Sequence, residues 1–125
     1  MNVIRESELN FIETPGGNAT AGIATASRGA REVSMIRQRQ QPGGGNPPHA
    51  HDREEVMLVT EGTVEVRIGE DTVTLIAGDT LVVPAETVHQ LANAGSSEAA
   101  WLLIAPAGVE FFHANGERAD PVWAR

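Results

Sequence analysis

The chain has no cysteine and no tyrosine, and all nine of its basic residues are arginine, so it has no lysine. The missing cysteine excludes disulfides, thiol nucleophiles and sulfur-ligated metal sites. The missing lysine and tyrosine exclude Schiff-base chemistry, lysine bases and tyrosine acids. Any chemistry must therefore use His, Asp, Glu, Ser, Thr, Arg or a bound metal.

Positive charge and long apolar runs are also scarce. The chain has nine basic and 17 acidic residues, a formal net charge of −8 at pH 7. This charge argues against a nucleic-acid partner and an anionic membrane surface. No run approaches the roughly 18–20 apolar residues that span a bilayer. Residues 1–10 include Glu6 and Glu8 and lack the apolar core of a secretory signal. We therefore predict a cytoplasmic protein with no nucleic-acid and no membrane partner.

The 125 residues, 41% of them hydrophobic, suffice for one domain over 1–125 with a buried core. Short segments rich in β-favouring residues are separated by Gly, Pro, Asn and Asp. These predicted strands are 32–40, 55–60, 63–68, 72–76, 80–83, 88–92 and 99–105. Their close spacing predicts an all-β sandwich or closed barrel.

Two segments are predicted to be loops. Residues 15–22 are rich in Gly, Thr and Ala and precede a weak strand at 23–26. Residues 41–48 read QPGGGNPP, and this density of Gly and Pro is incompatible with a strand or a helix. The only helical signal is a short turn near the C-terminus.

A histidine and carboxylate cluster follows the second loop. In an extended segment residues of equal parity share a face, so His49, His51 and Glu55 would project to the same side. Two imidazoles and a carboxylate suit a first-row divalent metal. His89 lies in another predicted strand, which antiparallel packing can bring opposite these three.

These residues also carry a resemblance. Gly43, His49, His51, Glu55 and Gly62 resemble the first motif of the cupin superfamily, G-x5-H-x-H-x3-E-x6-G, with every spacing met. This motif covers 43–62.

Residues 78–93 resemble the second cupin motif, G-x5-P-x-G-x2-H-x3-N. Gly78, Pro84, His89 and Asn93 match it. The departure is Glu86, which replaces a glycine that would relieve a turn.

The resemblance implies a single antiparallel jelly-roll β-barrel that binds one divalent transition metal, with Fe, Mn, Ni, Co and Zn all left open. It carries over four metal ligands: His49, His51, Glu55 and His89. Four protein ligands on an octahedral metal leave two adjacent positions for water, substrate or dioxygen.

Parity also suggests candidates for the substrate pocket. The five candidates are Met35, Arg37, Met57, Leu91 and Trp101. In the other register of the strand at 32–40, Ile36 and Gln38 face inward instead. Arg37 would pair with a substrate carboxylate or enolate, although exposure at an edge also explains it. Met57, Leu91 and Trp101 are better explained as ordinary core or pocket lining than as specific contacts.

Two residues near the C-terminus fit no motif. His113 matches no ligand spacing, which favours a surface position or a supporting role behind the ligands. A tryptophan on a terminal tail is often buried against the barrel or a partner subunit, and Trp123 is interpreted as dimer packing.

The resemblance to quercetinase-like cupins implies a dioxygenase acting on an enolate, catechol or flavonol, with Glu55 as the catalytic proton acceptor. With a redox-inactive metal, the same pocket would serve an isomerase, cyclase or lyase. A non-catalytic module that binds a small ligand is the third alternative. Small barrels of this kind commonly pair through an edge strand, so we expect a small-molecule substrate and a homodimer.

Overall fold

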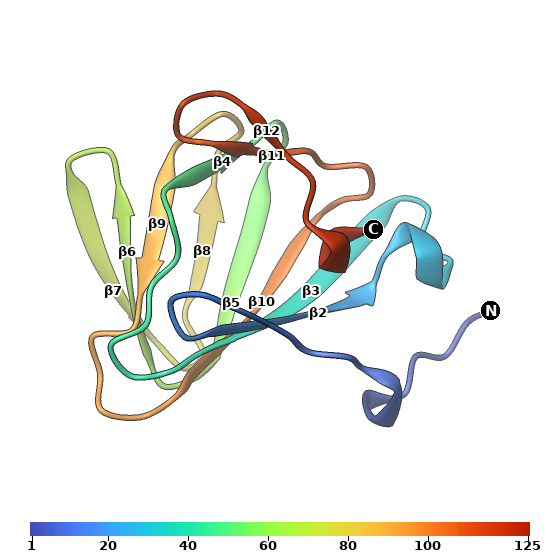
Figure 1. Cartoon of the computed structure of the whole chain (residues 1–125), viewed down its shortest axis with the longest axis horizontal. Coiled ribbons are helices and arrows are strands. Elements are labelled where there is room, and N and C mark those ends of the chain that lie inside the picture. The colour runs from blue at the N-terminus through green and yellow to red at the C-terminus, as the bar shows by residue number, and fades with distance from the viewer.

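A computed structural model describes all residues 1–125, and its strands form two six-stranded sheets (Figure 1). The first sheet has the spatial order β1 (Ile12–Thr14), β2 (Asn18–Ala24), β3 (Val33–Gln40), β10 (Ala99–Pro106), β5 (Glu55–Glu61) and β8 (Thr80–Val83). The second has the order β12 (Arg118–Ala119), β11 (Phe111–His113), β4 (His49–His51), β9 (His89–Ala92), β6 (Thr63–Ile68) and β7 (Asp71–Ile76). Three short 3-10 helices complete the chain: η1 (Glu6–Glu8), η2 (Ala26–Arg28) and η3 (Val122–Ala124).

All strand pairings are antiparallel, and from β3 onward the chain passes from one sheet to the other at most of its connections. This confirms the predicted all-β jelly-roll architecture. Segments adjacent in sequence thus lie on facing walls, which lets one site draw side chains from both sheets. None of the helices is long and apolar enough to cross a bilayer.

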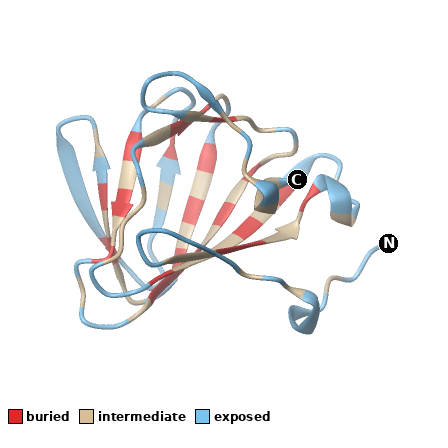
Figure 2. Ribbon diagram, viewed as in Figure 1, coloured by how far each residue is buried: buried red, intermediate tan, exposed pale blue.

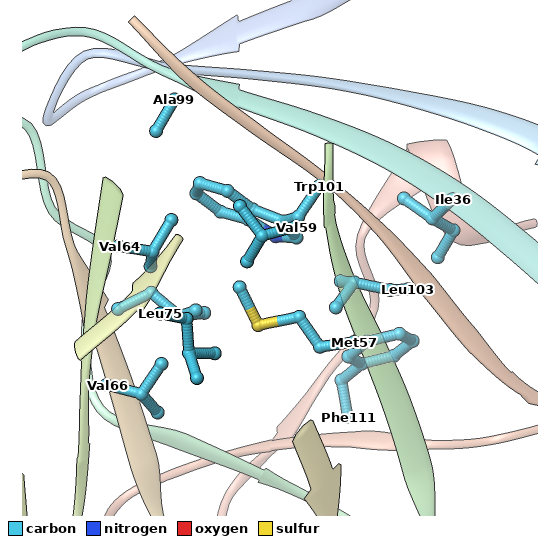
Figure 3. Close-up of a cluster of buried hydrophobic side chains, with 11 residues drawn as sticks. Ile36, Met57, Val59, Val64, Val66, Leu75, Ala99, Trp101, Leu103 and Phe111 are labelled. Atoms are coloured by element: carbon cyan, nitrogen blue, oxygen red, sulfur yellow. The ribbon is translucent and has the colours of Figure 1, made fainter. Parts of the chain in front are cut away.

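The hydrophobic core fills the space between the sheets (Figures 2 and 3). Met57 on β5 and Trp101 on β10 are 1% and 0% exposed and belong to this core. Burying each such side chain contributes about 1.5–3 kcal/mol to the free energy of unfolding. The outer strand β7 is largely exposed, as its pale colour in Figure 2 shows.

The sequence prediction was wrong for residues 15–22, because β2 begins at Asn18 and pairs with β3 along its length. The small side chains of this segment gave no apolar alternation. Ala21 and Thr20 are nevertheless buried, so pairing with a neighbouring strand outweighs weak intrinsic propensity here.

The turn before β9 contains the only residue other than glycine with a positive φ. Glu86 has φ 60°, at the position where the cupin motif has glycine. Its backbone N–H donates a hydrogen bond of 2.7 Å to the carbonyl oxygen of His51. The chain therefore keeps the turn despite the strain that a β-carbon adds in this region.

The C-terminal segment packs on its own chain. The rings of Trp123 and Phe111 meet edge to face at 5.5 Å. The hydroxyl of Ser27 donates a 2.7 Å hydrogen bond to the carbonyl oxygen of Arg125. Gly22 on β2 lies so close to the carbonyl of Trp123 that a β-carbon would collide with it. Trp123 thus packs on its own barrel, and its interpretation as a subunit contact stays a prediction.

Candidate metal centre

Three histidines converge from two neighbouring strands. His49 on β4 lies directly opposite His89 on β9 in the register of the sheet, and His51 is two residues along β4. The ring centroids are 4.3 Å apart for His49 and His89, 5.2 Å for His49 and His51, and 5.1 Å for His51 and His89. One ligand atom from each histidine lies within 4.8 Å of the other two. Antiparallel pairing thus brings His89 to the first two histidines, as the sequence suggested.

Backbone carbonyls fix the tautomers of two of these histidines. Nδ1 of His49 is 2.9 Å from the carbonyl oxygen of Pro47, and Nδ1 of His89 is 2.8 Å from that of Thr87. A carbonyl can only accept, so both Nδ1 atoms carry hydrogen. In the neutral ring Nε2 then keeps its lone pair, as a metal ligand requires.

Glu55 reaches the cluster from the opposite sheet. Its Oε2 is 3.2 Å from Nε2 of His51 and its Oε1 is 4.0 Å from Nε2 of His89. The prediction from parity, which needs residues 49–55 to be one extended segment, is wrong. The strand β4 ends at His51, the chain bends, and Glu55 begins β5. Equal parity is therefore not the cause of this approach, which follows from the crossing between sheets.

Burial sets the protonation of all four groups. His51, Glu55 and His89 are only 2–3% exposed. Desolvation, with the neighbouring histidines adding to it, lowers the pKa of His49 to about 4 and that of His51 to about 3. Burial also lowers the pKa of His89 and raises that of Glu55 to about 8. The imidazoles are therefore neutral at pH 7 and able to donate lone pairs.

Two of the inward-facing nitrogens make no hydrogen bond, although the carboxyl of Glu55 lies beside them. Nε2 of His51 and Nε2 of His89 are buried and lack a hydrogen bond. Leaving buried polar atoms unpaired costs about 1–3 kcal/mol each. Three neutral imidazoles beside a carboxyl form a donor set that a divalent transition metal would satisfy. The residues present therefore fit a metal, with His49, His51, Glu55 and His89 to hold it.

A cavity of about 330 Å³ opens beside this cluster, and His49 and His51 are part of its lining. Its apolar wall includes Leu103, Phe111, Phe112 and Trp123. Its polar wall includes Asn18, Thr20 and Gln38. No Arg, Asp or Glu side chain lines it.

The five pocket candidates from the sequence lie elsewhere. Met57, Leu91 and Trp101 belong to the buried core, and none of the five lines the cavity. Arg37 points away from it and forms a 2.8 Å ion pair with Glu6. Met35 has the same parity on β3 as Arg37. The other register holds instead, because Gln38 lines the cavity and Ile36 enters the core.

Sequence reasoning missed most of the cavity wall. Phe111 packs edge to face against His51 with the ring centroids 4.7 Å apart, and β11 is the strand that brings it there. On the same strand His113 lies opposite His49 and lines the cavity. The apolar pair Phe111 and Phe112 beside a histidine was the available signal, but it did not indicate the neighbouring strand.

The comparisons with known proteins agree with this geometry. The cupin domain family matches residues 36–105, which is more than half of the chain. The chain belongs to the cupin domain family. Both motifs and all four candidate ligands lie within the matched range.

The curated relatives of this cupin include plant proteins. Germin-like protein 1-1 of Oryza sativa subsp. japonica is 39% identical over 73% of this chain and 46% of its own length. Oxalate oxidase 1 of Hordeum vulgare is 36% identical over 74% of this chain and 45% of its own. The chain thus spans about half the length of these relatives.

Solved structures of other proteins share the fold of this chain. The polyketide cyclase RemF from Streptomyces resistomycificus superposes with a TM-score of 0.77 over 87% of this chain and 81% of its own, at 19% identity. A recombinant oxalate oxidase in complex with glycolate has a TM-score of 0.69 over 78% of this chain and 56% of its own, at 31% identity. The first shows the fold alone, and the second also shares sequence.

Proposed function

We propose that this cupin is a metal-dependent oxidoreductase of the dioxygenase type, acting on a small enolate-, catechol- or flavonol-like substrate. The observation that carries the proposal is the set of three neutral histidines beside Glu55, two of which line a cavity, with two buried Nε2 atoms that make no hydrogen bond. The oxalate oxidase relatives support oxidoreductase chemistry.

The cavity supports an apolar substrate with oxygen functions rather than a dicarboxylate. Its lining has aromatic and aliphatic side chains and no arginine. A dianion such as oxalate would be held by the metal alone, without the cationic partner that a second carboxylate needs. A planar ring can instead pack against Phe111, Phe112 and Trp123 while an oxygen function faces the histidines.

A bound redox-active cation would supply a Lewis acid for the substrate oxygen and a position for dioxygen. The three histidines would hold that cation, with two tautomers fixed by the carbonyls of Pro47 and Thr87. Glu55 is the proposed proton acceptor, because its carboxyl is the only one beside the cluster. Positive charge nearby lowers the pKa of a buried carboxyl, so Glu55 would be ionised when a cation is present.

The test is oxygen consumption by protein loaded separately with iron, manganese, nickel or zinc. We expect uptake with catechols or flavonols in at least one redox-active form and none in the zinc form. Uptake with oxalate alone would contradict the proposed substrate class. No uptake in any form, together with conversion of an enolisable substrate by the zinc protein, would favour an isomerase, cyclase or lyase.

We also propose a homodimer that pairs through an outer strand. The strand β7 is at the edge of its sheet and exposes Val73 and Ile76, which are 40% and 58% accessible. A mass of about twice 13.3 kDa by light scattering, reduced to the monomer by Ile76→Glu, would support it. An unchanged monomeric mass in the wild type would contradict it. Cytoplasmic residence stays a prediction from the sequence.

A further inference from the structure

The carboxamide of Gln38 on β3 lies on the sheet opposite the histidine strands and lines the cavity. Its Oε1 accepts a 2.8 Å hydrogen bond from the indole nitrogen of Trp101, its register partner on β10. An indole N–H can only donate. The buried indole of Trp101 therefore fixes which end of the Gln38 amide is oxygen and which is nitrogen.

The nitrogen end keeps an unused hydrogen. Nε2 of Gln38 donates one hydrogen bond of 3.2 Å to Oγ1 of Thr20, which is itself buried and lines the cavity. An amide nitrogen carries two hydrogens, and no protein acceptor takes the second. Filling the cavity with an entirely apolar molecule would strand this donor away from water, which is costly.

Resting on the proposed function, we infer that Gln38 determines substrate specificity by donating a hydrogen bond to an acceptor oxygen of the substrate. The histidines lie on one sheet and Gln38 on the facing sheet, with the apolar side chains of Leu103 and Phe111 also lining the space. The matching substrate has an apolar body, one oxygen function for the metal centre and a carbonyl oxygen at its far end. A site built to hydrogen-bond a substrate rejects an analogue that lacks the matching group.

The test compares two probes, catechol and 4-acetylcatechol, by calorimetric titration into zinc-loaded protein. Zinc is redox-inactive, so binding is read without turnover. We expect the wild type to bind 4-acetylcatechol about tenfold more tightly than catechol, the effect of one hydrogen bond. In Gln38→Leu the preference should fall below about twofold.

Two further variants separate recognition from folding. Arg39→Gln is the matched control on the same strand, since Arg39 stacks on the ring of Phe11 and does not line the cavity, and it should keep the tenfold preference. When its carboxyl is ionised, Gln38→Glu retains an acceptor for Trp101 but has no donor, so at a pH that ionises it the variant should lose the preference even if Gln38→Leu fails to fold.

The outcomes distinguish this inference from the proposed function. If catechol binds but the wild type does not prefer 4-acetylcatechol, or the preference survives in Gln38→Glu, the role of Gln38 is overturned while the proposed function stands. If neither probe binds the zinc-loaded wild type, catechols are excluded from the proposed substrate class and the inference fails with them.

Discussion

At the scale of the residue, burial makes all four groups of the metal centre neutral at pH 7, and a bound cation would favour ionisation of the carboxyl alone. Without metal, Glu55 holds a proton up to a pKa of about 8, while the imidazoles of His49 and His51 stay neutral down to about 4 and 3. A cation would be bound by these neutral imidazoles and would favour the ionised carboxyl.

Glu55→Gln tests the carboxyl. In the folded metal-free protein the pKa of Glu55 is raised from 4.5 to about 8, so the unfolded chain ionises first as pH rises. The wild type therefore loses stability between pH 4.5 and 8, and a glutamine does not. We expect metal-free Glu55→Gln to gain about 2–4 kcal/mol on the wild type by pH 8. Its affinity for zinc should fall at least about tenfold.

Urea unfolding in chelator at pH 5, 6.5 and 8 measures this gain. The control is Glu54→Gln, because Glu54 is the exposed neighbour of Glu55 and its replacement should give a difference that does not change with pH. If the stability difference between Glu55→Gln and the wild type also does not change with pH, the carboxyl is not held protonated by burial.

A second residue carries strain. Glu86 adopts φ 60°, where glycine is free of the β-carbon clash. We expect Glu86→Gly to raise the free energy of unfolding by about 1 kcal/mol, measured by denaturant titration. The adjacent Ala85→Gly, at a residue without positive φ, should lower it. A loss of stability in Glu86→Gly would mean that the glutamate side chain compensates for the strain.

The candidate ligands could be predicted from the sequence, but their surroundings could not. The residue types and spacing of His49, His51, Glu55 and His89 indicate a metal site without any knowledge of the fold. The cavity residue Gln38 was left between two registers, since both faces of the strand at 32–40 mix polar and apolar side chains.

At the scale of the element, the strands with strong alternation were predicted and those with small side chains were not. Residues 63–68 and 80–83 match β6 and β8 at both ends. The strands β1 and β2 lack large apolar residues at regular intervals, and β11 is only three residues long. Pairing partners far along the chain stabilise these three, and a local pattern does not report such partners.

The close approach of β2 and the C-terminal segment gives a prediction at this scale. A β-carbon at Gly22 would collide with the carbonyl of Trp123, so we expect Gly22→Ala to displace η3. The free energy of unfolding should fall by about 1–3 kcal/mol, and acrylamide should quench the fluorescence of Trp123 more strongly, while Trp101 remains buried.

The matched control is Gly45→Ala. Its β-carbon would make an ordinary contact of 3.6 Å with the carbonyl of Leu91, so stability should change by less than about 0.5 kcal/mol. Equal quenching in Gly22→Ala and the wild type would contradict the docking of the C-terminal segment on β2.

At the scale of the whole molecule, the repeated crossing between two sheets explains how a compact site forms from distant parts of the sequence. His49 and His89 are neighbours across β4 and β9, and Glu55 reaches them from the opposite sheet. The sequence has an excess of acidic residues, but this excess does not extend to the cavity, whose lining has no Asp or Glu. The overall charge of the chain therefore does not describe the cavity. The topology determines which side chains line the cavity and what it can bind.

The most direct measurement is the metal content of protein purified without chelator. We expect one equivalent of a divalent transition metal per chain, falling below about 0.1 equivalent in His51→Ala and in His89→Ala. The control His113→Ala should keep one equivalent, because His113 lines the cavity but lies outside the cluster of three histidines. One full equivalent in His51→Ala or His89→Ala would contradict the metal centre described for this cupin.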